Sequence, residues 1–258
     1  MSTPHEPPHI HALYRYPIKG LSPERMDTTV LSPGEVIAGD RAYALENGSA
    51  DFDPQNPRHF PKSKFIMLMK HESLARLNTQ YDADTHIVKI LAPGGESLEA
   101  HLKSVEGRRA LETFIQDFMP EKLRGIPKLV YSQGHSFSDV PQKYVSIINL
   151  ASLRDLEEKA QLKLHPLRFR ANIYLEGLDP WVEMEWLNKR LGSGHVSLEI
   201  AKTTVRCPAT QVNPETAARD IDVPKLLRDH YGHQILGVYA HIVSGGTIAP
   251  GDAITIPA

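Results

Sequence analysis

The segment TTVRCPATQVNPETA, residues 203–217, contains the single cysteine of the chain, Cys207. It continues residues 196–202, whose pattern is typical of a β-strand, and the proline directly after the cysteine ends that strand. A strand that runs into a polar, proline-containing loop is a common position for functional residues. Lys202 and Arg206 bring positive charge close to the cysteine, and such charge favours the thiolate that binds metals and attacks electrophiles. Neighbours on a strand point to opposite faces, but at its end Arg206 and Cys207 can both reach one pocket.

A single cysteine limits the redox chemistry that the chain can carry by itself. It excludes an internal disulfide, a cysteine-rich zinc site and a four-cysteine iron–sulfur cluster. If the protein does redox chemistry, its electrons must therefore come from a partner protein or a soluble donor. Taken without its neighbours, a lone cysteine is most often a small buried apolar residue.

The composition is that of an ordinary soluble globular protein, with 258 residues of which 41% are hydrophobic and 23% charged. The formal charge of −2 gives no basic field, so we expect no nucleic-acid partner. The N-terminus lacks the features of a signal or transit peptide. No apolar stretch approaches the roughly 20 residues that a membrane span needs. We expect no membrane association and, for a bacterial protein, a cytoplasmic location.

Turn signals are frequent along the whole chain, with 20 prolines and 17 glycines spread evenly. This density is typical of many short strands joined by turns. The patterns predict strands at residues 10–18, 65–69, 169–176 and 196–202, and a strand over 36–45 that is broken at Gly39-Asp40. They further predict a hairpin over 87–102 and strands joined by turns over 235–256. They also predict helices over 106–119, from Ser152 with Asp155 at the capping-box position, and from Pro224 to a stop at Gly232.

These elements predict a mainly β fold with a few helices, an α+β class. The composition changes over residues 127–143, and we divide the chain there into an N-terminal domain, 1–130, and a C-terminal domain, 131–258. Residues 51–64 are polar and hold three prolines, which predicts an exposed loop. His135, Ser136, Ser138 and Asp139 could suggest a hydrolase, but the sequence has no nucleophile-elbow pattern. We interpret them as part of a solvent-exposed loop.

Five short motifs follow one another along the chain: Tyr14-Arg15-Tyr16-Pro17-Ile18-Lys19-Gly20-Leu21, Gly39-Asp40-Arg41, Phe169-Arg170-Ala171-Asn172-Ile173, Arg206-Cys207 with Thr210, Val212, Pro214 and Thr216, and Gly246-Thr247-Ile248 with Pro250-Gly251-Asp252. In this order they resemble the motifs of MOSC domain proteins. The first two resemble those of the N-terminal β-barrel domain that accompanies MOSC. The resemblance covers nearly the whole chain and implies a MOSC-type β-barrel after an N-terminal β-rich domain.

The resemblance implies that Cys207 ligates the molybdenum of a molybdenum–pterin cofactor through its thiolate sulfur, a soft ligand. It also implies a set of residues that hold the phosphate and the polar edge of the pterin. Forked guanidinium groups match phosphate oxygens well. The set comprises Lys19, Arg41 and Arg170, with Asn172 and Arg206 as further hydrogen-bonding candidates and Tyr239 as a weaker match.

Three positions depart from the family pattern. Gly20 stands where a serine is common, Ala171 replaces a proline, and Ala217 replaces the glycine of a turn. These departures bear on loop geometry and on the substrate pocket more than on cofactor binding.

The relatives that the resemblance indicates are the amidoxime-reducing components and the bacterial hydroxylaminopurine-resistance proteins. It implies a molybdenum-dependent oxidoreductase that reduces small N-hydroxylated compounds, namely hydroxylamines, amidoximes or N-hydroxylated bases. Because the chain cannot carry its own four-cysteine cluster, the electrons would come from a separate flavin or iron–sulfur protein.

Other functions remain open. Cys207 could carry sulfane sulfur as a persulfide without any metal, or the protein could store or deliver the cofactor without turnover. A cysteine hydrolase would need a histidine near Cys207, and His233 or His241 could serve. His9 and His11 could face one side of a strand and bind a metal, although a third ligand is not evident.

Overall fold

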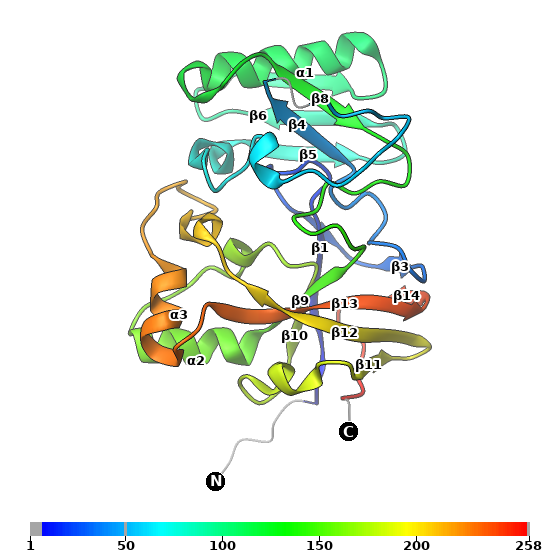
Figure 1. Ribbon diagram of the computed structural model, residues 1–258, viewed down its shortest axis with the longest axis vertical. Helices are drawn as coiled ribbons and strands as arrows, with labels where there is room; N and C mark the ends of the chain where they lie inside the picture. The colour runs from blue at the N-terminus through cyan, green and yellow to red at the C-terminus, as the bar shows by residue number, and fades with distance from the viewer. Residues whose placement is uncertain (1–6, 49–50, 257–258) are drawn as a thin grey trace.

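The computed structural model describes residues 7–48 and 51–256, which form two stacked groups of β-strands (Figure 1). The lower group in Figure 1 is a seven-stranded sheet with two α-helices beside it. The upper group contains smaller sheets and the helix α1 (Val105–Phe118). The predicted class, mainly β with a few helices, is confirmed.

The seven-stranded sheet has the strand order β11-β12-β13-β9-β10-β1-β2. Its strands are β1 (His9–Arg15), β2 (Glu24–Met26), β9 (Val145–Asn149), β10 (Ile173–Glu176), β11 (Arg190–Ser193), β12 (Val196–Val205) and β13 (Ile235–Ser244). Along the first half of β12, buried residues alternate with half-buried ones, which is the period of two expected for a strand with one covered face. The covered face packs into a core that includes Leu13, Ile147, Ile173, Ile200 and Val238.

The first strands of the chain belong to this lower group. β1 pairs with β10, with Leu13 opposite Ile173, and β3 (Thr29–Leu31) pairs with β14 (Gly246–Ile248). The division of the sequence at residue 130 stays a prediction. In space, the N-terminal segment contributes strands to the group that the second half of the chain builds.

The upper group consists of two small antiparallel sheets covered by α1. One pairs β4 (Tyr43–Asn47) with β8 (Pro127–Tyr131). The other is formed by β5 (Asn78–Asp82), β6 (Ile87–Leu91) and β7 (Ser97–His101), and the last two make the predicted hairpin.

Helix α1 closely matches the helix predicted over residues 106–119. Ser104 is its N-cap, because its Oγ accepts a hydrogen bond of 2.9 Å from Gly107 N. Leu111 and Ile115 lie on the buried face of the helix, in the core of the upper group.

Helix α2 (Leu150–Ala160) begins earlier than predicted, and its cap is a different residue. Asn149 is the N-cap; its Oδ1 accepts from the second residue of the helix at 3.0 Å. Ser152 lies inside the first turn, fully buried, and donates to the Glu183 carboxylate. Asp155 accepts hydrogen bonds from two aromatic side chains, so both polar residues make tertiary contacts rather than a capping box.

Helix α3 (Val223–Tyr231) follows the prediction. Pro224 lies in its first turn, and Gly232 ends it with a left-handed backbone at φ 75°. Within residues 7–48 and 51–256, no helix combines the length and the apolar character that crossing a bilayer requires.

The prediction of a strand over residues 65–69 is wrong. Phe65 makes one isolated bridge to Glu46, after which the chain turns. The apolar run is buried because it lies between two cores: Phe65 packs in one, and Ile66 and Leu68 pack in the other. Periodicity alone cannot distinguish a buried strand from such a buried irregular segment.

Other predicted strands are shorter than expected. The break predicted at Gly39-Asp40 is present as a turn, and within the segment 36–45 a strand begins only at Tyr43. The strand predicted over 169–176 is reduced to β10. The 3₁₀ helix η4 (Pro166–Phe169) precedes β10, and Arg170 between them has a left-handed backbone with φ 51°. In the C-terminal tail, β13 and β14 are present, but the last predicted strand forms only isolated bridges.

Candidate functional site

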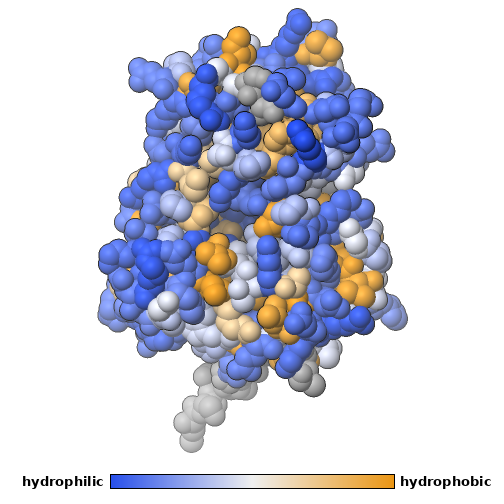
Figure 2. Space-filling model, in the orientation of Figure 1, coloured by the Kyte–Doolittle hydropathy of each residue, from blue (hydrophilic) through white to orange (hydrophobic). Residues whose placement is uncertain are grey.

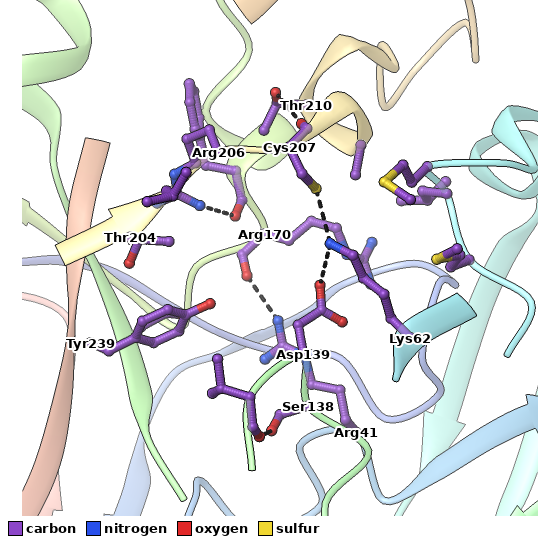
Figure 3. Close-up of a pocket in the computed structure, with 18 of the residues that line it drawn as sticks. Arg41, Lys62, Ser138, Asp139, Arg170, Thr204, Arg206, Cys207, Thr210 and Tyr239 are labelled. Carbon is purple, nitrogen blue, oxygen red and sulfur yellow. Dashed lines mark hydrogen bonds and ion pairs between the residues drawn. The ribbon is translucent and has the colours of Figure 1, made fainter. Parts of the chain in front are cut away.

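A pocket of about 410 Å³ lies between the end of β12, with Thr204 and Cys207, and the loops that carry Lys62 and Asp139 (Figure 3). Its volume falls within the range of roughly 300–1,000 Å³ that is usual for small-molecule and cofactor pockets. All the site residues that the sequence predicted line it: Lys19, Arg41, Arg170, Asn172, Arg206, Cys207 and Tyr239. On the face of the molecule in Figure 2, hydrophobic side chains are scattered among hydrophilic ones, without one broad apolar patch.

Cys207 is the second residue after the end of β12 and the N-cap of the 3₁₀ helix η6 (Pro208–Gln211). The backbone N and the hydroxyl of Thr210 both donate to the carbonyl of Cys207, at 3.0 and 2.9 Å, which holds the backbone in place. The free thiol is half-buried, and its Sγ lies 3.4 Å from Lys62 Nζ. Arg206 and Cys207 line the same pocket, as expected at the end of a strand.

A chain of charged groups leads away from the sulfur. Lys62 Nζ lies 3.4 Å from Asp139 Oδ2, and Lys19 Nζ donates to Asp139 Oδ1 at 2.5 Å. Lys19 is only 7% exposed and also donates to the carbonyl of Phe137 at 2.8 Å. Figure 3 shows the contacts from Cys207 to Lys62 and on to Asp139 as dashed lines.

The charges of this chain stabilise one another. Burial opposes ionisation of Asp139, but Lys19 and Lys62 outweigh it and hold the pKa of this carboxyl well below its usual range. Burial likewise opposes the charge on Lys62, but Asp139 and Cys207 outweigh burial, so the pKa of Lys62 is raised. For Lys19 burial dominates and lowers its pKa, in spite of the Asp139 carboxylate.

Arg41 and Arg170 approach the same aromatic ring. Their guanidinium carbons lie 4.5 and 4.2 Å from the centroid of Tyr16, which is fully buried. Both arginines have positive φ, 49° and 51°, a backbone that non-glycine residues rarely adopt and that is enriched at functional sites. Arg41 pairs with the Asp40 carboxylate and donates to the carbonyl of Arg170 at 3.0 Å.

The Arg170 guanidinium differs from that of Arg41 because it lacks a carboxylate partner. Among the described residues, no hydrogen bond or ion pair engages it; its one close partner is the Tyr16 ring. Burial, together with the nearby charge of Arg41, lowers the pKa of Arg170 to about 10. The side chain therefore presents a poorly solvated cation to the pocket.

Arg206 and Thr204 carry further donors without partners. Arg206 is 7% exposed; its Nε donates to the carbonyl of Leu236 at 2.8 Å and its Nη1 to that of Phe169 at 3.0 Å. Within the part of the chain that the structure describes, the buried Nη2 of Arg206 and the buried hydroxyl of Thr204 have no hydrogen-bond partner. Buried polar atoms of this kind are few in native proteins, and each needs an explanation such as a ligand or a bound water.

Asn172 is the predicted residue whose side chain is most fully engaged inside the protein. It is 1% exposed, its Oδ1 accepts from the backbone and the hydroxyl of Ser146, and its Nδ2 donates to the carbonyl of Tyr14. These bonds tie Asn172, which directly precedes β10, to β1 and β9 at the lining of the pocket.

Tyr239 lies on β13, opposite Lys202 on β12 and Ser146 on β9. Its ring stacks on Tyr144 at 5.6 Å, and the ammonium of Lys202 lies within 5.6 Å of both rings. Burial raises the pKa of Tyr239, so its hydroxyl stays protonated at neutral pH. Lys202 and Arg206 both line the pocket, but the ammonium of Lys202 lies over the rings of Tyr144 and Tyr239.

The sequence interpretation missed Lys62 and Asp139. Lys62 lies in the segment interpreted as an exposed loop, and Asp139 lies in the serine-rich loop attributed to solvent exposure. Their polar surroundings gave no signal that two loops distant in sequence meet at the cysteine. Pro57 and Pro61, which restrict the backbone just before Lys62, are the local sign that the first loop has a fixed course.

The alternative histidine sites receive no support from the geometry. His233 packs against Trp181 and His241 against Tyr144, and neither lines the pocket of Cys207. The described residues contain no group of three or more His, Cys, Asp or Glu side chains placed to hold a metal ion, and this includes the surroundings of His9 and His11.

Known proteins match the chain along most of its length. The family model described as MOSC domain matches residues 133–255, and the one described as MOSC N-terminal beta barrel domain matches residues 8–120. Mitochondrial amidoxime-reducing component 1 of Homo sapiens is 30% identical over 277 residues, with 94% of this chain and 81% of that protein covered. The Mus musculus protein of the same name is 24% identical over 282 residues, with 94% and 80% covered.

Among solved structures, the YUAD protein from Bacillus subtilis aligns with a TM-score of 0.44 and 15% identity, covering 96% of this chain and 94% of that one. The family models and the human relative together establish the family. This chain belongs to the MOSC domain proteins and carries the MOSC N-terminal β-barrel domain ahead of its MOSC domain.

Proposed function

We propose that this protein binds a molybdenum–pterin cofactor through Cys207 and reduces small N-hydroxylated compounds. The observation that carries the proposal is the meeting, in one pocket, of the only cysteine sulfur with the Arg170 guanidinium, which lacks an anionic partner among the described residues. The sulfur offers a soft metal ligand and the guanidinium offers a forked phosphate partner. The relatives named as amidoxime-reducing components support the substrate class.

The residues of the pocket fit a phosphate-bearing metal cofactor. Besides Arg170, the pocket lining carries three buried donors without partners among the described residues: the Nη2 of Arg206, the hydroxyl of Thr204 and the Nε of Arg168. All three belong to residues that line the cavity with Cys207. An anion with several oxygen acceptors would satisfy such donors, whereas an apolar ligand would leave them unpaired.

The predicted cofactor-binding residues divide into two roles. Arg170 and Arg206 would contact the phosphate and the polar edge of the pterin directly. Lys19 and Arg41 already have the carboxylates of Asp139 and Asp40, so they would act mainly through their charge. We expect Asn172 to support the floor of the pocket, because three of its hydrogen bonds are made within the sheet, and Tyr239 to line its wall.

Reduction of an N-hydroxylated compound takes two electrons and two protons, breaks the N–O bond and releases water. The bound cofactor would supply the metal that exchanges oxygen and electrons with the substrate. The chain itself would hold this group at Cys207, keep Lys62 and Asp139 beside the sulfur, and exclude bulk water from the buried side of the pocket. A separate flavin or iron–sulfur protein would deliver the electrons, because one cysteine cannot hold a four-cysteine cluster.

The test is elemental analysis of protein purified from a host that makes the cofactor. We expect about one molybdenum per wild-type chain and less than about a tenth of that in Cys207→Ala, because the metal loses its soft ligand. Cys207→Ser is the matched variant: it keeps the shape of the side chain but offers a hard oxygen, and it should also lose most of the metal. Thermal unfolding of both variants checks that the fold is retained.

Turnover of an aromatic amidoxime with a chemical electron donor then separates an enzyme from a carrier. A metal-loaded wild type without turnover would leave cofactor storage or delivery as the function. A metal-free wild type from such a host would overturn the proposal, and cyanide-releasable sulfur on Cys207 would then identify a persulfide carrier.

A further inference from the structure

Lys62 lies in a short 3₁₀ helix, η1 (Lys62–Lys64), whose course the protein fixes. Phe60 before the helix and Phe65 after it pack in the same small core. The turn is closed by backbone hydrogen bonds from Lys64 N to the carbonyl of Pro61 at 3.0 Å and from Phe65 N to that of Lys62 at 3.1 Å. The lysine therefore has a defined direction, although its segment is rich in polar residues.

The Lys62 ammonium has two partners in the pocket. Its Nζ lies 3.4 Å from Cys207 Sγ and 3.4 Å from Asp139 Oδ2. Asp139 is in turn held by the buried Lys19. Lys62 thus bridges the sulfur and a fixed carboxylate, and the carboxylate keeps the ammonium in reach of the sulfur.

We propose that Lys62 is a positioning residue for the cysteine ligand. Its ammonium donates an N–H···S hydrogen bond to Cys207 Sγ, which orients the sulfur and raises the reduction potential of the metal bound there. This inference rests on the proposed function and assigns a role to a residue outside the family motifs of the sequence.

The physical reason is the effect of a donor on a ligand sulfur. A hydrogen bond from a cation draws electron density away from the sulfur, so the sulfur donates less to the metal and the reduced metal is favoured. Lys202 is the lysine closest to Cys207 in sequence, but it does not donate a hydrogen bond to the sulfur. Its ammonium lies over the rings of Tyr144 and Tyr239.

The first test uses the full-length protein without cofactor and measures the rate at which iodoacetamide alkylates Cys207 at neutral pH. Lys62→Met should change the alkylation rate about two- to fivefold, the value of a partly exposed charge contact, because the sulfur loses the ammonium that holds it in place. Lys62→Arg keeps the charge and should restore the rate. Lys64→Met, an exposed lysine of the same helix, is the control and should match wild type.

The second test uses the molybdenum-loaded protein. It measures the midpoint potential of the metal in a redox titration that is monitored by electron paramagnetic resonance. Lys62→Met should keep its molybdenum but show a more negative potential than wild type, with Lys62→Arg in between and Lys64→Met unchanged. Equal potentials in Lys62→Met and Lys64→Met would overturn the inference. If the wild type binds no molybdenum, the proposed function fails, and equal alkylation rates in the two methionine variants would separately overturn the contact between Lys62 and Cys207.

Discussion

Two walls of the same pocket handle positive charge in opposite ways. The paired wall consists of Lys19, Lys62 and Arg41, each in contact with a carboxylate of Asp139 or Asp40. The open wall consists of Arg170, Arg206 and Thr204, which carry donors that no described residue engages. Both walls share the aromatic ring of Tyr16, over which one arginine from each wall lies.

The difference indicates where an anion belongs. On the paired wall an anionic ligand must compete with Asp139 or Asp40, whereas on the open wall it would compensate donors that are already desolvated. An unpaired buried cation costs stability, and proteins accept such a cost mainly at functional sites. The paired wall is thus expected to maintain the structure and the position of Cys207, and the open wall to bind the ligand.

The largest loss of stability is expected from adding a methyl group at Gly237, which packs closely against Arg206 of the open wall. Gly237 on β13 has φ 80°, and a Cβ there would lie 2.4 Å from the carbonyl oxygen of Ile147 and 3.1 Å from Arg206 Nη2. Gly237→Ala should lower the free energy of unfolding by about 3 kcal/mol, from backbone strain and overpacking together. Urea denaturation followed by circular dichroism measures this.

Gly134 supplies the matched control for this substitution. It has a similar φ, 71°, but a Cβ there would meet nothing within 4 Å. Gly134→Ala should therefore cost only the strain of a left-handed backbone, about 1 kcal/mol. Equal losses in the two variants would mean that Gly237 does not hold Arg206 and β9 in close contact.

A smaller effect is expected from removing the anion of the paired wall. Asp139→Asn leaves the buried Lys19 without an anionic partner, with neutral acceptors alone around its ammonium. Because the Asp139 side chain is 44% exposed, water screens the loss, and we expect a destabilisation of about 1–2 kcal/mol at pH 7. The same substitution converts the paired wall into a second open one, so binding of inorganic phosphate, measured by calorimetry, should strengthen.

The stabilising effect of Asp139 should depend on pH in a defined direction. The pKa of Asp139 is lower in the folded protein than the value near 3.9 expected for the unfolded chain. Its contribution to stability is therefore fully present above about pH 5 and is lost as the pH falls toward the folded pKa. The stability difference between wild type and Asp139→Asn should be constant from pH 5 to 8 and shrink below pH 4; a difference that grows on acidification would contradict the pairing.

On each wall the sequence predicted two of the three residues: Lys62 was missed on the paired wall and Thr204 on the open wall. Arg170 and Arg206 lie in motifs shared with a family, and Arg206 adjoins Cys207 at the end of a strand, where local geometry alone brings both to one pocket. Lys62 and Asp139 belong to loops 77 positions apart. Their meeting depends on how the two loops pack over the upper sheets, and no periodic pattern encodes such a contact.

The errors in the fold have the same origin. The turn Pro93-Gly94-Gly95 between two strand-like runs predicted the hairpin β6–β7, and the pattern of residues 196–202 predicted the start of β12. Buried residues alternate with more exposed ones along β6 and the first half of β12, so each has one covered face. Residues 65–69 failed because they are buried between two cores, where burial no longer implies a strand. Ser152 and Asp155 suit a capping box in sequence, but tertiary partners engage both side chains.

The smallest change in stability is expected at Arg170, with the largest change in ligand binding. Arg170→Met removes a desolvated guanidinium, which raises the stability of the folded protein. It also removes the contact of this cation with the Tyr16 ring, which lowers the stability by about 0.5–1 kcal/mol. These nearly cancel, so the free energy of unfolding should stay within about 1 kcal/mol of wild type, as for the exposed Arg109→Met. The molybdenum content of Arg170→Met should nevertheless fall at least about tenfold if this cation holds the phosphate, which charge-assisted bonds of this type can explain. A marked loss of stability with full metal content would instead assign Arg170 to the structure and move the anion to the paired wall.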